Sequence, residues 1–169
     1  MYLYMFLLLL SCRASSYFIP LKETPYLQKI DKTTLIKEII CLLDSANTSS
    51  NGYFHTPVNL TITDCAHKNT NKFIEELNKL NQSSKCMSVV SKQMEKLEDI
   101  CSVLKKKTTH ENNCETEDVE FPEFKKKMER FLEWINEKLT CNSTVRNEVD
   151  LDVYNCSLNC WQRYHKRWL

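Results

Sequence analysis

The sequence predicts an all-α chain that folds as an up-up-down-down four-helix bundle with two long crossover loops and disulfides. The 169 residues are 42% apolar, which suits one domain with one core. A single glycine and four prolines leave little of the turn chemistry that strands and hairpins require. Four amphipathic segments are joined by a long, a short and a long connection. The short connection makes the middle two helices antiparallel, and each long connection allows the two helices that it joins to run parallel.

The first helix is predicted over residues 31–45, with Asp31 as its N-cap. Its apolar face is formed by Leu35, Ile36, Ile39, Ile40 and Leu43. The polar segment 46–64 is too long for a tight turn and is interpreted as the first crossover. The second helix, capped by Asp64, extends to about residue 81 and carries Ala66, Thr70, Phe73, Leu77 and Leu80 at helical spacing.

A short polar link leads to the third helix, predicted over residues 86–106. Its apolar stripe is Val90, Met94, Leu97, Cys101 and Leu104. Residues 108–120 form the second long connection. The fourth helix begins at Pro122, which is a favourable residue for a first turn. Its predicted inner face is formed by Phe124, Met128, Phe131, Leu132, Ile135 and Leu139.

The chain divides into three predicted parts. Residues 1–16 are a signal peptide, because an apolar run of about ten residues precedes small residues near Ser16 and is too short to span a bilayer. Residues 17–141 form the bundle, and residues 142–169 are a C-terminal extension of unknown role. An alternative interpretation of the first part is a lipoprotein signal with acylation at Cys12. In either case we expect export, and for the signal peptide a secreted, extracellular protein.

Nine cysteines occur, and loss of Cys12 with the signal leaves eight. An even number in an exported chain predicts disulfides. The candidates are Cys41, Cys65, Cys86, Cys101, Cys114, Cys141, Cys156 and Cys160. Sequons for N-linked glycans, which belong to the same compartment, are at Asn47, Asn59, Asn81, Asn142 and Asn155.

The bundle limits the disulfide pairings without choosing one. Cys65 can pair with Cys101, which lies at the same end of the bundle, or with Cys114 in the second crossover. Cys41 and Cys86 share the opposite end and can form a second bridge. Cys86 and Cys101 cannot pair with each other, because fifteen residues of straight helix separate them by about 22 Å.

Charge and motifs exclude several functions. Lys plus Arg number 23 and Asp plus Glu 22, so no net field attracts nucleic acid, and membrane insertion is not expected. The chain carries no nucleophile elbow, phosphate loop or HExxH motif, so we expect neither an enzyme nor a cofactor or metal. The alternative from another class is a disulfide-rich lipid-binding or inhibitor module.

Two stretches carry a resemblance to a known family. They are YFHTP at 53–57 followed by Cys65 and FIEEL at 73–77, and EFKKKMERF at 123–131. Over residues 31–140 the chain resembles the short-chain cytokines of the common gamma chain family, particularly interleukin-2, interleukin-15 and interleukin-21. In the latter two, two cysteines seven residues apart precede the phenylalanine of the second helix, and both bridge to the second crossover. Here Cys65 matches the first of them, and Lys72 stands at the position of the second. Cys86, Cys101 and Cys141 resemble interleukin-4 and interleukin-13 instead.

The resemblance implies a monomeric interleukin that binds and pairs receptor ectodomains, the common gamma chain and a second chain, to trigger kinase signalling in immune cells. In that family a glutamine on the fourth helix faces the common gamma chain, and Glu133 stands at its position here. By analogy the first helix faces a second receptor through Lys37, Glu38 and Asp44.

Two further features lie outside the family pattern. Trp134 falls off the apolar stripe of the fourth helix, so it is a candidate binding anchor or packs against the leader or tail. The extension 142–169 ends in a basic aromatic tail. We expect its removal to leave signalling intact.

Overall fold

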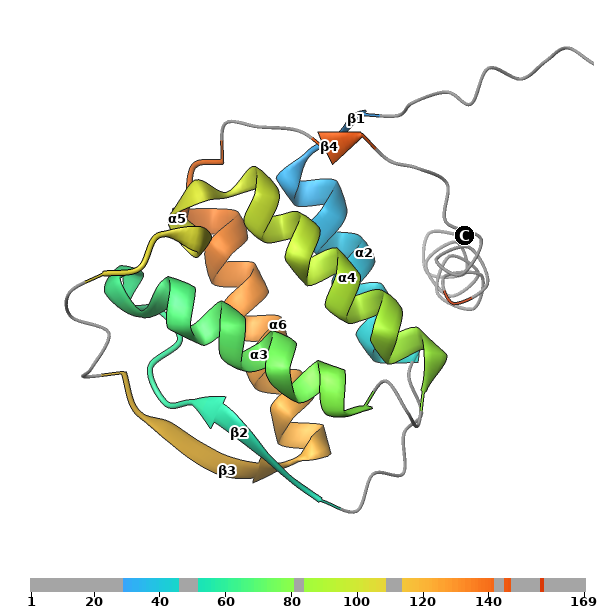
Figure 1. Ribbon diagram of the computed structural model, residues 1–169. Coiled ribbons are helices and arrows are strands. Elements are labelled where there is room, and N and C mark those ends of the chain that lie inside the picture. The colour runs from blue at the N-terminus through green and yellow to red at the C-terminus, as the bar shows by residue number, and fades with distance from the viewer. Residues whose placement is uncertain are drawn as a thin grey trace, which may run out of the picture.

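The computed structural model describes residues 29–45, 52–80, 84–108, 114–141, 145–146 and 156. These residues are mostly helical, as the periodicity predicts (Figure 1). The long helices are α2 (Lys32–Ser45), α3 (Ala66–Leu80), α4 (Lys85–Ile100) and α6 (Phe121–Lys138). A short helix α5 (Ser102–Lys105) follows α4, and a 3₁₀ turn η1 (Thr63–Cys65) precedes α3.

The helix boundaries follow local chemistry at two of the predicted ends. Asp31 caps α2, because its Oδ1 accepts a hydrogen bond of 2.8 Å from the Thr34 amide. Pro122 lies in the first turn of α6, where its missing N–H has no helical partner in any case. Both predictions are confirmed.

Two other predicted ends are wrong. Asp64 does not cap α3: it lies inside η1, where the Cys65 amide donates to the Ile62 carbonyl at 3.0 Å and delays the α-helix to Ala66. The third helix is interrupted at Cys101, whose φ of −116° and ψ of 87° are not helical. The apolar stripe continues through the break, since Cys101 and Leu104 are both buried, so periodicity alone does not reveal it.

The predicted apolar stripes form the core. Every inward residue predicted for the second, third and fourth helices is buried, and in α2 only Ile40 is partly exposed. An aromatic cluster joins α3 to α6: the ring of Phe73 lies 5.7 Å from Phe124 and 5.4 Å from Phe131. Phe54 from the first crossover adds to it at 5.1 Å from Phe124. The burial of these aromatic rings stabilises the packing of the first crossover against α3 and α6.

The two crossovers pair as a short antiparallel ribbon that the sequence does not predict. β2 (Tyr53–Pro57) and β3 (Thr116–Glu120) align Tyr53 with Glu120 and Pro57 with Thr116. Lys127 on α6 lies beneath the ribbon and is 8% exposed; its Nζ donates to the Pro57 carbonyl at 3.2 Å and contacts the Glu117 carboxylate. The ribbon lies along one side of the helices (Figure 1).

A second ribbon involves the predicted C-terminal extension. β1 (Lys29–Ile30) pairs antiparallel with β4 (Val145–Arg146), with Ile30 opposite Val145. Ile30 is buried, and this ribbon lies at the start of α2 (Figure 1). The segment before the first helix and the segment after the last therefore meet by main-chain pairing.

Disulfides are confirmed, but two of the considered pairings are wrong. The bonds join Cys65 to Cys114, Cys86 to Cys156 and Cys101 to Cys141, and Cys41 is disulfide-bonded as well. Cys65 therefore takes the crossover partner and not Cys101, and Cys86 does not pair with Cys41. Cys160 lies outside the described residues. Several cysteines share each end of the bundle, so helix ends alone do not select partners.

Candidate binding surface

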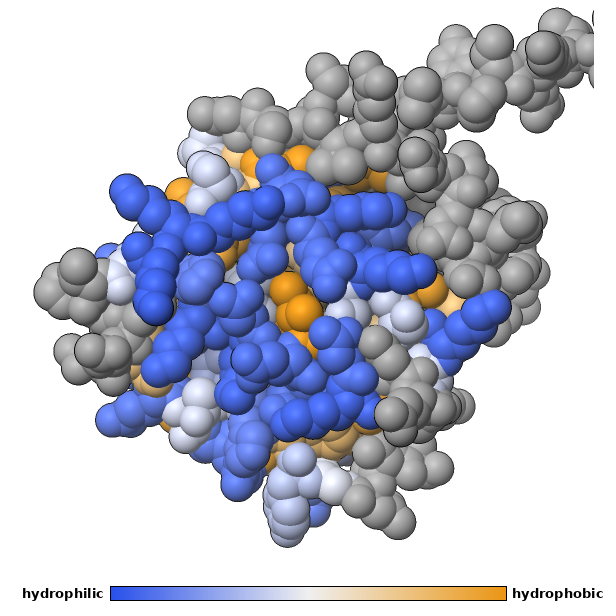
Figure 2. Space-filling view, in the orientation of Figure 1, coloured by the Kyte–Doolittle hydropathy of each residue, from blue (hydrophilic) through white to orange (hydrophobic). Residues whose placement is uncertain are grey.

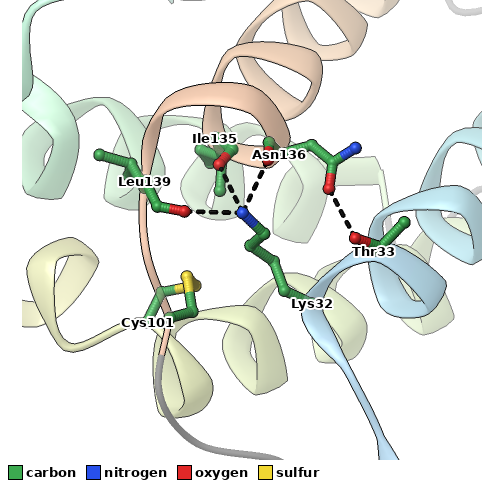
Figure 3. The surroundings of a disulfide bond; sticks show 7 residues. Lys32, Thr33, Cys101, Ile135, Asn136 and Leu139 are labelled. Carbon is green, nitrogen blue, oxygen red and sulfur yellow. Dashed lines mark hydrogen bonds between the residues drawn. A yellow bond between two sulfur atoms is a disulfide. The ribbon is translucent and has the colours of Figure 1, made fainter.

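Helices α2 and α6 lie side by side and run in opposite directions. At the start of α2, Lys32 Nζ donates to the carbonyls of Ile135, Asn136 and Leu139 at 3.2, 2.7 and 2.6 Å (Figure 3). The hydroxyl of Thr33 donates to Asn136 Oδ1 at 2.9 Å. The last carbonyls of a helix lack intrahelical partners and attract a cation, so Lys32 joins the two helix ends.

At the other end of α2, charged groups from both helices meet. Lys125 Nζ lies 4.0 Å from Asp44 Oδ1. Partial burial raises the pKa of Glu129, and the charge of Asp44 raises it further against the opposing charge of Lys125. The charge of Glu133, one turn further along α6, adds to this rise. Two predicted receptor-contact residues, Asp44 and Glu133, thus flank Glu129.

Lys37 belongs to the same side of α2 as Asp44. The two are seven residues apart, which is close to two helical turns, and both are exposed. We define the α2–α6 surface as the side chains of Lys37, Asp44, Lys125, Glu129 and Glu133. The surface is polar and carries both signs of charge.

Two predicted contact residues lie elsewhere. Glu38 is half-buried toward α4: burial raises its pKa, and the charge of Lys96 on α4 opposes the rise. Trp134 is only 9% exposed, and its ring stacks on Phe131 with centroids 5.8 Å apart. The prediction that Trp134 is an exposed anchor is wrong, because the ring packs at the edge of the aromatic core although it lies off the apolar stripe.

Lys125 and Glu129 complete the α2–α6 surface and are not predicted from the sequence. Glu129 precedes Glu133 by one helical turn, which was an available signal, but its proximity to Asp44 depends on how the two helices pack. Of the sequons, Asn59 is exposed, and its carbonyl accepts a hydrogen bond of 2.9 Å from Asn69 Nδ2. Asn47, Asn81, Asn142 and Asn155 lie outside the described residues.

The first crossover carries three exposed apolar side chains that were not predicted from the sequence. Tyr53, Val58 and Ile62 are 74%, 40% and 43% exposed, and no other large apolar side chain among the described residues is exposed. On the neighbouring strand, the Asp118 carboxylate contacts the His55 imidazole. None of these three apolar residues belongs to the α2–α6 surface.

No helix in the described ranges combines the length and apolar composition needed to cross a membrane. Within the same ranges, no three His, Cys, Asp or Glu side chains cluster as metal ligands. The disulfides are typical of extracellular proteins. Comparison of the chain with protein-family models, curated proteins and solved structures finds no match.

Proposed function

We propose that this protein is a secreted helical cytokine that pairs two cell-surface receptors and so triggers intracellular kinase signalling in immune cells. The observation that carries the proposal is the α2–α6 surface, where Asp44 and Glu133 from different helices flank one partly buried carboxyl group. A rigid surface built from two packed helices binds a receptor with little ordering cost. One receptor docks on this surface and a second docks on another side of the bundle.

The proposal includes an up-up-down-down topology, and contacts between helix ends support it. The start of α2 contacts the end of α6 through Lys32. Cys101 and Cys141 join the ends of α4 and α6, with their Cα atoms 4.6 Å apart. The Thr108 hydroxyl, shortly after α5, donates to the Asp64 carbonyl before α3 at 2.7 Å. Together these contacts gather two helix starts and two helix ends at one end of the bundle.

The pairing of the crossovers is further support. In this topology both long connections run the length of the bundle, as in cytokine bundles, so they can lie beside each other. β2 and β3 belong to these two connections and are hydrogen-bonded over five residues each.

For the receptor class, we propose the common gamma chain together with a second chain. The disulfide between Cys65 and Cys114 supports this choice, because it joins the start of α3 to the second crossover, as the resemblance to interleukin-15 and interleukin-21 implies. The alternative is an interleukin-4 or interleukin-13-like receptor pair, favoured by the disulfide between Cys101 and Cys141 near the end of α6. The alternative from another class is a lipid-binding module, which would use the exposed apolar side chains of Tyr53, Val58 and Ile62.

The test is surface plasmon resonance of the purified secreted chain against a panel of receptor ectodomains. We expect binding to the common gamma chain and to one second chain. The double variant Asp44→Lys, Glu133→Lys should weaken one of these interactions about tenfold or more, because like charges then face the receptor. Glu95→Lys with Glu115→Lys, at exposed positions outside that surface, makes the same change in net charge and should leave that interaction unchanged.

Each other outcome has a defined meaning. Binding to the interleukin-4 or interleukin-13 receptors alone would replace the proposed receptor pair. Binding to lipid vesicles with no binding to any ectodomain would overturn the cytokine proposal. If the double variant and the Glu95, Glu115 control variant lose receptor affinity equally, the α2–α6 surface is not the receptor-binding surface.

A further inference from the structure

A hollow of about 330 Å³ lies between α3 and the second crossover. One wall carries Lys68 and Lys72 from α3, and the other carries Lys107, Cys114 and Thr116. No residue that lines it comes from α2 or α6, so it is separate from the α2–α6 surface. Figure 2 shows that hydrophilic side chains cover most of the face formed by α3 and α4. The hollow is large enough for a small ligand or one sugar unit of a polymer.

The lining is cationic. Three lysines and one carboxylate, Glu75, contribute a net charge of +2 (three minus one). Lys72 Nζ lies 2.9 Å from Glu75 Oε2, but the Glu75 side chain is 61% exposed, so solvent screens this pair and it is weak. An anionic group that displaces Glu75 gains more than one ammonium partner.

The two walls are held together before any ligand arrives. Cys114 bonds to Cys65, just before α3, with the Cα atoms 5.8 Å apart. Lys68 Nζ also donates to the Cys114 carbonyl at 3.0 Å. A site whose walls are cross-linked loses less conformational freedom on binding, which favours affinity.

The neutral donors in the lining indicate the kind of anion. Asn71 presents an amide, with Nδ2 at 3.0 Å from His67 Nε2, and Thr116 presents a hydroxyl. Amide and hydroxyl groups suit a ligand that carries hydroxyls beside its charge. Apart from the His67 imidazole the lining has no aromatic ring, so it lacks the stacking platform that nucleic-acid bases require.

We propose that this hollow binds a sulfated polysaccharide, with sulfate esters contacting the ammonium groups of Lys68, Lys72 and Lys107. The sugar hydroxyls then meet the polar side chains of Asn71 and Thr116. Lys106 precedes Lys107 and is exposed, so a chain longer than the hollow meets a further cation. Such polymers are extracellular, the compartment of which the disulfide beside the hollow is typical. The site does not depend on the proposed receptors.

The test uses the full secreted chain and a heparin-derived hexasaccharide as the probe, with the dissociation constant measured by calorimetry at low and physiological salt. We expect binding that weakens as salt rises, because released counterions and screening govern such contacts. The variant Lys72→Gln, Lys107→Gln should weaken it about tenfold. The control variant Lys126→Gln, Lys138→Gln removes the same charge from α6, and its dissociation constant should stay within about twofold of the parent value.

A variant of opposite sign keeps the test independent of folding. Glu75→Gln removes the only lining carboxylate and should strengthen hexasaccharide binding several-fold, which a misfolded protein cannot imitate. Equal losses in the two lysine pairs would indicate attraction to net charge and overturn the proposal. The proposal would also be overturned if inorganic sulfate binds and the hexasaccharide does not, or if phosphatidylserine vesicles bind with the same affinity as the hexasaccharide.

Discussion

Cys156 is bonded to Cys86 at the start of α4, 70 positions earlier in the chain, with the two Cα atoms 5.6 Å apart. Cys156 is also buried among the core residues. The bond therefore attaches a residue of the predicted extension to the bundle, and β4 attaches the same segment to β1.

The first prediction concerns this bond. Replacing both cysteines, Cys86→Ala with Cys156→Ala, should lower the free energy of unfolding by about 2 to 4 kcal/mol, because the unfolded chain regains the freedom of a long loop. Urea denaturation followed by circular dichroism measures the loss. A chain ending at residue 141 should lose at least as much, since it lacks β4 too. Unchanged stability in both would mean that the segment contributes nothing to the fold.

The second prediction concerns Lys32, whose ammonium group satisfies three carbonyls at the end of α6. Lys32→Met keeps the length of the side chain and removes the charge, so it should cost about 1 to 2 kcal/mol of stability. Lys37→Met, on the exposed side of the same helix, is the control and should change stability by less than about 0.5 kcal/mol. Similar effects from both variants would contradict the capping role.

The third prediction concerns Trp134. Its indole is buried against Phe131, so Trp134→Ala should cost about 3 kcal/mol of stability through lost contacts and a cavity. The adjacent exposed Glu133→Ala should cost less than about 0.5 kcal/mol. Thermal unfolding of the two variants in parallel distinguishes a core residue from a surface anchor, for which stability would not change.

The fourth prediction concerns pH. Burial raises the pKa values of Glu38, Glu98 and Glu129 in the folded protein. The folded state then binds protons more tightly than the unfolded state, whose glutamates titrate near about 4.3. Stability should therefore rise as the pH falls from neutral through the folded pKa values, and this gain is complete below the unfolded value.

Asp31 contributes to the pH dependence of stability with the opposite sign and at lower pH. Hydrogen bonds from Thr34 lower its pKa, so its contribution is present above the unfolded value and is lost only as the pH falls through the folded one. Urea unfolding at about pH 7 and about pH 5 tests the glutamates. Glu129→Gln should be more stable than the parent at neutral pH and should gain less on acidification. A parent protein that loses stability between these pH values would contradict the prediction.

The local features of the chain were predictable because they depend on neighbouring residues. Helical spacing of Phe124, Met128 and Phe131 predicts the inner face of α6 whatever packs against it. The Asp31 cap needs only the Thr34 amide three residues later. For the same reason the break at Cys101 escaped prediction: the apolar stripe continues across it, while the backbone there departs from a helix.

What only the tertiary structure decided involves partners that are distant in the chain. β2 forms because a segment about 60 positions later pairs with it, and neither strand has a hairpin turn to announce it. The choice of Cys114 over Cys101 for Cys65 depends on which thiol packing brings within bonding distance, and eight cysteines allow 105 pairings. The α2–α6 surface also depends on residues that are distant in the chain, because Asp44 lies near Lys125 and Glu129 only when the two helices pack side by side.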